Sequence, residues 1–266
     1  MPISILKVLW SNKNLLNQFT KRDVVGRYKG SYLGLLWTFI TPLLMLVIYT
    51  FVFSEVFKAR WGTVGGNKAE YALVLFTGLI VFNIFSEVIT RAPSLLVGNS
   101  NLVTKVVFPL EIMPVAILCA SIFHALINFA LLIVSLILIL GVLQWTLFLA
   151  PLVLLPLILL TLGLGWILAS LGVYLRDLGQ VIGIAMQAIM LMSPIFYPIS
   201  SIPENLRIIY YINPVSYVIE DMRRVVIWGE MPNWTWLGIG TVIGLVVFMA
   251  GYSWFQKTKK GFADVL

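Results

Sequence analysis

Long apolar stretches alternate with shorter polar segments along the whole chain. A helix needs about 20 apolar residues to cross the hydrocarbon core of a bilayer. Several windows satisfy this requirement, and the pattern predicts six membrane-spanning helices. The fifth is the least regular, because Pro194 and Pro198 interrupt its end. The predicted spans cover residues 33–53, 71–90, 115–140, 147–172, 181–199 and 235–256.

Two further segments have a helical pattern but do not fit a spanning helix. Residues 3–19 separate apolar from polar side chains around a helix, which is typical of a helix lying in the membrane interface. The segment from Ser216 to Trp228 is also helical in pattern and is too short to span. The apolar face of the first segment consists of Ile5, Leu9, Leu16 and Phe19, opposite Lys7, Asn14 and Gln18.

Composition places the chain among integral membrane proteins. Hydrophobic residues make up 60% of the 266 residues and charged residues only 11%, whereas a soluble domain carries about 25% charged residues. The single cysteine, Cys119, excludes an intramolecular disulfide. We therefore predict one all-α membrane domain over residues 1–266. It comprises an interface helix and basic segment (1–32), a six-helix bundle (33–256) and a short tail (257–266).

Lysine and arginine are distributed unequally between the two sides of the predicted bundle. Twelve lie in the segments that share a side with the termini, and six lie in the loops on the other side. Cytoplasmic loops carry the excess of basic residues, so this count predicts a multi-pass protein of the cell (inner) membrane with both termini in the cytoplasm. The net charge of +7 is thereby explained by topology and requires no nucleic-acid partner.

The stretch "NLVTKVVFPLEIMP" (101–114) lies in the predicted cytoplasmic loop between the second and third spans. It is too polar to span the membrane and more apolar than a solvated linker. An exposed apolar loop of this kind is normally covered. Two interpretations remain open: the loop packs on its own bundle, or it docks a soluble partner.

Catalytic patterns are missing from the sequence. The chain contains no G-x-x-x-x-G-K-[ST] phosphate loop, and one histidine, His124, cannot form a metal-ligand cluster. Glu87 is the one carboxylate near the end of the second span, and Arg91 follows at the spacing of a helical ion pair. We therefore predict a protein that is not an enzyme, with no metal site and no cofactor of its own.

Polar and aromatic side chains inside the predicted spans allow two interpretations each. Ser121, His124, Asn128 and Ser135 form one stripe of the third span, either bonding to neighbouring helices or lining a hydrated path. The aromatic residues either pack toward lipid or offer rings on which sugars stack. The aromatic candidates for a glycan path are Trp37, Phe39, Tyr49, Phe82, Phe85 and Tyr197.

Four motifs carry a resemblance to a known family. The stretches "GRYKGSYLGLLWTFITPLL", "NLVTKVVFPLEIMP", "VYLRD" and "INPVSYVIEDMR" resemble the transmembrane permease subunit of bacterial polysaccharide ABC exporters, which export O-antigen, capsule or teichoic acid. The resemblance extends over nearly the whole chain. It implies a homodimer bound to two copies of a separate ATP-binding subunit, which binds the ATP and magnesium.

The resemblance also assigns roles to segments of this chain. It implies that the loop between the second and third spans docks the ATPase, that the first and fifth spans line a channel, and that short helices re-enter the membrane between the fifth and sixth spans. The docking residues would be Asn101, Leu102, Lys105, Phe108 and Glu111.

We therefore predict a permease that moves a lipid-linked polysaccharide from the cytoplasmic to the outer side. Arg27 and Lys29, with Arg176, are candidates to receive the phosphate between lipid and glycan, because guanidinium and ammonium groups pair with phosphate. The alternative is that they only anchor helix ends.

Three other functions are alternatives for a chain of this composition. The chain could export a small hydrophobic compound, act as a lipid-linked glycosyltransferase, or form a passive channel. A transferase needs clustered acidic residues near the membrane face, whereas Asp23, Glu111 and Asp177 are scattered along the sequence. A passive channel would not need a docking loop.

Overall fold

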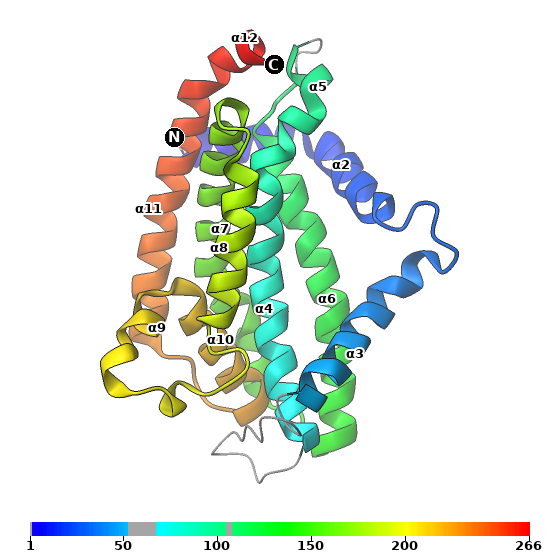
Figure 1. Ribbon diagram of the computed structural model, residues 1–266, viewed down its shortest axis with the longest axis vertical. Helices are drawn as coiled ribbons and strands as arrows, with labels where there is room; N and C mark the ends of the chain where they lie inside the picture. Colours follow the sequence, from blue (N-terminus) through cyan, green and yellow to red (C-terminus); the bar gives the residue numbers. More distant parts are fainter. Residues whose placement is uncertain (1, 53–67, 105–107) are drawn as a thin grey trace.

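The computed structural model describes the chain except for residues 1, 53–67 and 105–107 (Figure 1). Every regular element in the described part is helical, which confirms the predicted all-α fold. The α-helices are α1 (Pro2–Ser11), α2 (Lys13–Gly26), α3 (Trp37–Thr50), α4 (Lys68–Leu95), α5 (Ser100–Thr104), α6 (Ile112–Leu140), α7 (Ala150–Tyr174), α8 (Leu178–Leu191), α9 (Ile208–Ile212), α10 (Pro214–Arg223), α11 (Trp234–Thr258) and α12 (Phe262–Val265).

Four helical segments are long and apolar enough to cross a membrane, and two further apolar helices are shorter. The long segments are Ala69–Leu95, Ile112–Leu140, Trp145–Tyr174 and Trp234–Val265. The shorter helices are α3 and α8, each of 14 residues, or about 21 Å of helix. Helix α8 ends at Leu191 rather than at residue 199, because the chain turns ahead of Pro194 and Pro198. The count of six spans stays a prediction.

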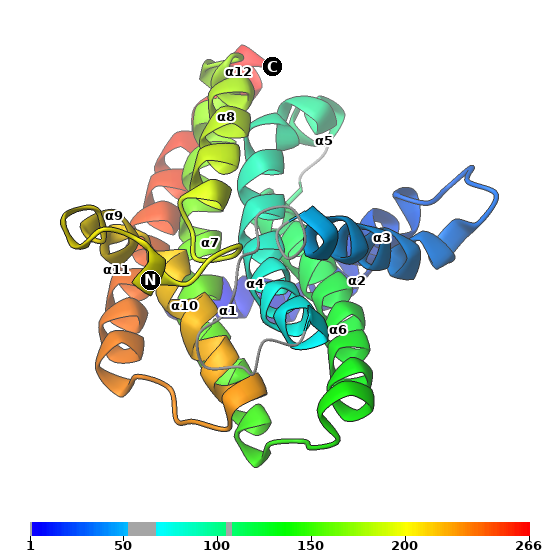
Figure 2. The same cartoon turned by 60° about the horizontal axis from the view of Figure 1, so that its bottom comes forward.

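Helix α4 forms the centre of the bundle. Of its most apolar window, 78% is buried, against 11% for the window in α11. Helices α6, α7, α8 and α10 pack around α4 (Figures 1 and 2). Its apolar side chains therefore contribute to the core on all sides, as is typical of a helix that is hydrophobic around its circumference.

Helix α7 joins this centre to the peripheral helix α11 by close backbone contacts. A Cβ at Gly163 would overlap the backbone of Val247 in α11, and a Cβ at Gly172 would overlap the carbonyl of Pro93 in α4. Small residues let helices approach closely enough for van der Waals packing, which is the main attraction between helices in lipid.

One end of the bundle, here called the α5 end, gathers both termini and α5 (Figure 1). Ile5 of α1, Leu96, Leu110 and Phe262 of α12 are buried in one hydrophobic cluster with the first turns of α6. The burial of Ile5 agrees with its place on the predicted apolar face of the N-terminal helix. This cluster therefore fixes the N-terminal helix, the C-terminal tail and the α4–α6 loop to one another.

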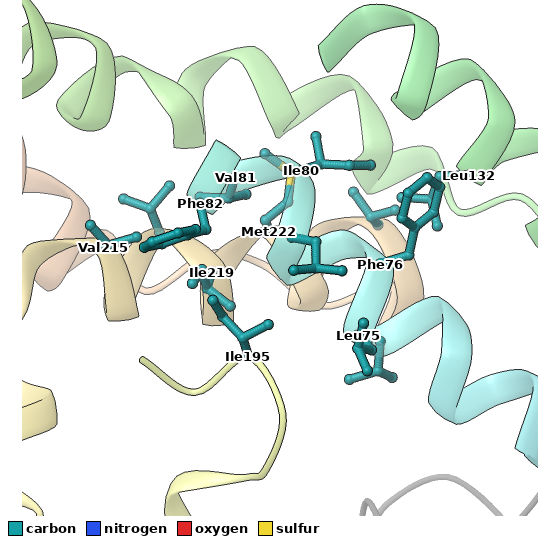
Figure 3. Packing of buried hydrophobic residues seen from close by; sticks show 14 of the residues in the cluster. Leu75, Phe76, Ile80, Val81, Phe82, Leu132, Ile195, Val215, Ile219 and Met222 are labelled. Atoms are coloured by element: carbon teal, nitrogen blue, oxygen red, sulfur yellow. The ribbon is translucent and has the colours of Figure 1, made fainter. Parts of the chain in front are cut away.

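The opposite end, here called the α10 end, carries the predicted short helices. Helix α10 starts behind Asn213, whose side chain accepts a hydrogen bond from the backbone nitrogen of Val215, and a π-helical turn follows over Arg224–Trp228. The prediction of a helix from Ser216 to Trp228 that is too short to span is confirmed. Val215, Ile219 and Met222 of α10 pack against α4 (Figure 3).

Arg223 fastens α10 to the rest of the bundle. Its side chain is fully buried, and its guanidinium donates to the carbonyl oxygens of Val74 (3.0 Å), Pro194 (2.5 Å) and Ile195 (3.0 Å). It also pairs with Glu220 at 2.8 Å. A planar fork with five donors satisfies several acceptors at once. Arg223 is one of the six basic residues that the predicted topology assigns to loops on the side away from the termini, whereas in the structure its buried side chain links α10 to its neighbours.

We expect Arg223→Lys to destabilise the fold severely. Lysine keeps the charge but cannot reach three carbonyl oxygens from one ammonium, and breaking a buried charged network costs roughly 3–5 kcal/mol. Thermal unfolding of the purified protein in detergent measures the effect. Arg224→Lys is the matched control, because Arg224 is 37% exposed and pairs with the exposed Glu230. Equal unfolding temperatures for the two variants would contradict the role given to Arg223.

Candidate functional site

The loop between α4 and α6 presents one short helix outward. After the turn Val97–Asn99, helix α5 exposes Asn101 and Thr104, while Leu102 and Val103 are half-buried against the cluster at the α5 end. The flanks of the loop are covered by the protein itself, since Leu96 and Leu110 are buried. The structure thus combines the two interpretations of the loop: its flanks pack on the bundle and its tip is available for a partner.

Glu111 is placed differently from its predicted role in docking. Its side chain is 5% exposed, and its Oε2 accepts a hydrogen bond from Lys259 Nζ at 2.8 Å. Its carbonyl oxygen accepts from Trp166 Nε1 at 3.0 Å. In this conformation the carboxylate pairs inside the chain with the C-terminal segment, and a role of Glu111 in docking stays a prediction.

The other predicted docking residues are divided among three situations. Asn101 and Leu102 lie on α5, as expected. Phe108 is half-buried and packs on α2, with its ring centroid 4.9 Å from that of Phe19. Lys105 lies outside the described residues. Among the described docking residues, the accessible ones therefore lie on α5.

A second feature is a cavity of about 290 Å³ where α2 ends and α3 begins, here called the polar pocket. Helices α4 and α6 supply its other walls. Half of the stripe predicted on the third span reaches it, since His124 and Asn128 line the pocket. The full lining is Arg27, Tyr28, Trp37, Thr38, Thr41, Pro42, Asn83, Ser86, Glu87, His124 and Asn128.

Ion pairs between α2 and α4 border the polar pocket. Arg91 Nη1 donates to Asp23 Oδ2 at 2.7 Å and lies 3.3 Å from Glu87 Oε1, which confirms the predicted Glu87–Arg91 pair. Glu87 also pairs with Arg27. Burial and the neighbouring Arg91 lower the pKa of Arg27. Two carboxylates and two guanidinium groups balance, so the cluster adds no net charge to the pocket.

Three polar atoms of the polar pocket have no hydrogen-bond partner among the described residues. They are Thr38 Oγ1, His124 Nε2 and Asn128 Oδ1, and all three side chains are less than 10% exposed. Buried polar atoms are normally satisfied by protein or by ordered water. The pocket therefore has the chemistry to hold water or a hydroxyl-rich group.

The remaining members of the stripe behave differently. Ser121 and Ser135 donate to carbonyl oxygens of their own helix, at Leu118 (3.0 Å) and Leu131 (2.9 Å). Hydrogen bonds from these two serines to neighbouring helices, the first of the two interpretations, are therefore not what the structure forms. The placement of His124 and Asn128 favours the second interpretation, a hydrated path.

The three candidates for binding phosphate are not brought together. Arg27 lines the polar pocket but is paired with Glu87, so its charge is already compensated. Lys29 and Arg176 are exposed and lie outside the lining of the pocket. The assignment of Arg27, Lys29 and Arg176 to the phosphate therefore stays a prediction, and Arg27 is the member of the set that lines the pocket.

The predicted aromatic path is also only partly present. Trp37 lines the polar pocket, with its Nε1 donating to Ser31 Oγ at 2.9 Å, and Phe39 is 40% exposed on α3. Phe82 and Phe85 are each 4% exposed and belong to the core, where Phe82 points toward Val215 of α10 (Figure 3). In this conformation they fill the interface around α4, and their assignment to a path stays a prediction.

The two other aromatic candidates lie nearer the α10 end. The ring of Tyr49 stands edge-on to Phe196 at 5.3 Å, and Tyr197 meets Tyr210 edge-on at 6.1 Å, with their hydroxyl groups in contact. Both are half-buried, so they stay candidates for a path rather than core residues.

The chain is similar to known membrane transport proteins over most of its length. Residues 14–227 match the family described as ABC-2 type transporter. The chain is 28% identical to the O-antigen export system permease protein RfbA of Myxococcus xanthus over 264 residues, covering 98% of this chain and 99% of that protein. A protein of the same name from Klebsiella pneumoniae is 28% identical, with 95% of each chain covered.

A more distant relative extends this range. The polysialic acid transport protein KpsM of Escherichia coli is 25% identical over 235 residues, covering 87% of this chain and 89% of that protein. Similarity over nearly the full length includes the loop that carries α5, the segments around the polar pocket and the short helices of the α10 end.

We expect the Asp23–Arg91 pair to show a measurable coupling between α2 and α4. Asp23→Arg and Arg91→Asp should each lower the unfolding temperature, and the double exchange should recover most of the loss. A coupling of about 1 kcal/mol is expected, since Arg91 is 38% exposed and solvent screens part of the attraction.

The matched control is the same exchange at Glu204 and Arg207. Glu204 is 90% exposed, so its pair with Arg207 should show no measurable coupling. A double-mutant cycle in which the two pairs behave alike would refute the role given to the cluster.

Proposed function

The chain belongs to the ABC-2 type transporter family, and from this premise we propose that it is the permease subunit of an ATP-driven exporter of a lipid-linked polysaccharide. The observation that carries the proposal is the likeness, over 95% or more of the chain, to proteins named O-antigen export permeases. These relatives are transport subunits, so the chain is a permease and an ATP-binding subunit accompanies it.

The polar pocket supports a role in receiving the cargo. A lipid-linked glycan carries a charged phosphate group and many hydroxyl groups, and moving them through hydrocarbon is costly unless they are hydrated or paired. Trp37 offers an aromatic face, and Thr38, His124 and Asn128 offer unpaired polar atoms. An incoming phosphate would compete with Glu87 for Arg27, so binding of the head group would loosen the contact between α2 and α4.

Helix α5 is the proposed contact with the ATP-binding subunit. It is held by a buried cluster that also contains residues of α1, α6 and α12. A partner that pushes on α5 would therefore act on both termini and on the bundle together. ATP and magnesium would be bound by that partner, and their contribution is the energy of hydrolysis.

A homodimer and a cytoplasmic position of the α5 end complete the proposal. Helix α3 exposes Phe39, Leu43, Leu44 and Val47 although it is short for a span, and a second copy of the chain would cover such a surface. The basic residues favour the cytoplasm for the side of the termini.

If α5 contacts the ATP-binding subunit, a bulky residue on α5 should weaken that contact. We expect Asn101→Trp to reduce retention of the ATP-binding subunit during purification about tenfold or more, because a 1.4 kcal/mol loss of affinity is already tenfold. Ser201→Trp, an exposed position at the α10 end, is the control. Native mass spectrometry of the unmodified complex should give two copies of each subunit. Undiminished retention by Asn101→Trp would exclude α5 as the contact.

Filling the polar pocket should block export without preventing assembly. Asn83 lines the pocket and is exposed, so Asn83→Trp fits the fold while occupying the space. Export of glycan to the cell surface is expected to fall severely, at normal membrane abundance and normal retention of the ATP-binding subunit. Val242→Trp, an exposed position on α11, is the control. Normal export by Asn83→Trp would remove the pocket from the pathway.

The orientation can be tested by chemical labelling. We expect a cysteine introduced at Asn205 to react with an impermeant thiol reagent in intact cells, and a cysteine at Gly261 to react only after permeabilisation. Both are tested in a chain with Cys119→Ser. Reversed labelling would overturn the assignment of the α5 end to the cytoplasm.

A further inference from the structure

A second cavity lies at the α10 end and shares no lining residue with the polar pocket. Its volume is about 350 Å³, and α9, α10, the π-helical turn and the start of α11 line it. Pockets that bind small molecules occupy roughly 300–1,000 Å³, so the cavity is large enough for a small ligand. Because aromatic rings from four elements contribute to it, it is called the aromatic pocket below.

Stacked rings form one wall of the aromatic pocket. The rings of Tyr217 and Trp236 lie 4.4 Å apart between centroids at an angle of 16°. Tyr210 and Trp228 contribute two further aromatic side chains. Flat aromatic surfaces with polar tips combine apolar contact with a place for a hydrogen bond. This wall therefore fits a ring-shaped ligand that has both apolar and polar parts.

Unsatisfied polar atoms point to a ligand rather than to simple packing. Ser216 lines the pocket and is 1% exposed, and its hydroxyl has no hydrogen-bond partner among the described residues. Trp228 is half-buried, and its Nε1 is also buried without a hydrogen-bond partner among the described residues. A buried polar group without a partner is costly to the fold. Two such groups in one pocket indicate that a donor and an acceptor there await a bound molecule.

The charges of the aromatic pocket restrict the class of ligand. Its lining contains three carboxylates, from Glu220, Asp221 and Glu230, against one guanidinium, from Arg224. Arg224 is already paired with Glu230 at 3.2 Å, and Glu220 is paired with the buried Arg223 at 2.8 Å, so Asp221 supplies the excess negative charge. A phosphate or carboxylate would meet repulsion here. Carboxylates retain lone pairs beyond those used internally, so they suit hydroxyl groups as donors.

We propose that the aromatic pocket binds a neutral sugar ring at the α10 end. The apolar face of the sugar would lie on the outer face of Trp236, which is stacked on Tyr217. Its hydroxyl groups would donate to Asp221 and Glu220, and Ser216 with Trp228 would complete the hydrogen bonds. The inference rests on the proposed function in one respect, because an exporter of glycans brings sugar rings to this face. The aromatic pocket would thus be a second glycan-binding site, separate from the polar pocket.

The test is equilibrium binding of radiolabelled sugars to the purified permease with its ATP-binding subunit. The complex is placed in phosphatidylcholine nanodiscs, because glycoside detergents would themselves occupy a sugar site. The probes are methyl glycosides of glucose, galactose, mannose and rhamnose and linear oligosaccharides of the same sugars. Saturable binding of at least one probe is expected, and a tighter oligosaccharide would identify an extended chain rather than a single headgroup sugar as the source.

Ser216→Ala separates binding from folding. It removes a hydroxyl that has no partner in the fold, so the unfolding temperature should not fall, while affinity should drop roughly three- to tenfold. Trp236→Ala should weaken binding about tenfold by removing the stacking surface. Trp234→Ala is the matched control, because Trp234 is 53% exposed, lies outside the lining and should bind as the unmodified protein does.

Three results would overturn the proposal: no saturable binding by any probe, affinity in Ser216→Ala and Trp236→Ala that is unchanged from the unmodified protein, or displacement of the sugar by phosphatidylethanolamine, which would make the pocket a lipid site. The measurement needs neither ATP nor transport. A failure here leaves the export proposal standing. Normal export by Asn83→Trp would count against the polar pocket but would leave sugar binding at the aromatic pocket unchanged, so the two failures are distinguishable.

Discussion

The ion pairs between α2 and α4 set the geometry on which the proposed function depends. Asp23 lies in α2 and Arg27 directly follows it, while Glu87 and Arg91 lie one turn apart on the central helix. Charges this close to hydrocarbon must be compensated, because removing one partner of a buried pair leaves an unpaired charge. The pairing fixes where α2 ends, and therefore where the chain turns into α3 and encloses the polar pocket.

The two ends of the bundle are fastened by different physical means. At the α5 end, apolar side chains from both termini cover the α4–α6 loop, and the pair of Glu111 with Lys259 ties the loop to the C-terminal segment. At the α10 end, Arg223 binds α10 to carbonyl groups of α4 and of the turn after α8. Helix α4 runs between these two ends and is largely buried. A displacement of α5 would therefore be transmitted along a packed element.

Local patterns in the sequence predicted the elements of the fold, and distant pairing determined the details that the sequence left open. The short helix before Trp228, the apolar face containing Ile5 and the Glu87–Arg91 pair follow from helical spacing alone. The intramolecular partners of Glu111 and Asp23 could not be predicted, because they lie 148 and 68 residues away. Phe82 and Phe85 have no feature in the sequence that separates a core aromatic from one lining a path, and Arg223 has none that separates a buried arginine from one on a loop.

The central claim is that the polar pocket receives the head group of a lipid-linked glycan. Photo-crosslinking measures this directly: benzoylphenylalanine is introduced at Ser86, which lines the pocket, and at Val246, which is exposed on α11. Cells that synthesise the glycan are irradiated, and the adducts are identified by mass spectrometry. We expect glycan–lipid adducts at Ser86 and ordinary phospholipid adducts at Val246. Phospholipid adducts alone at both positions would contradict it.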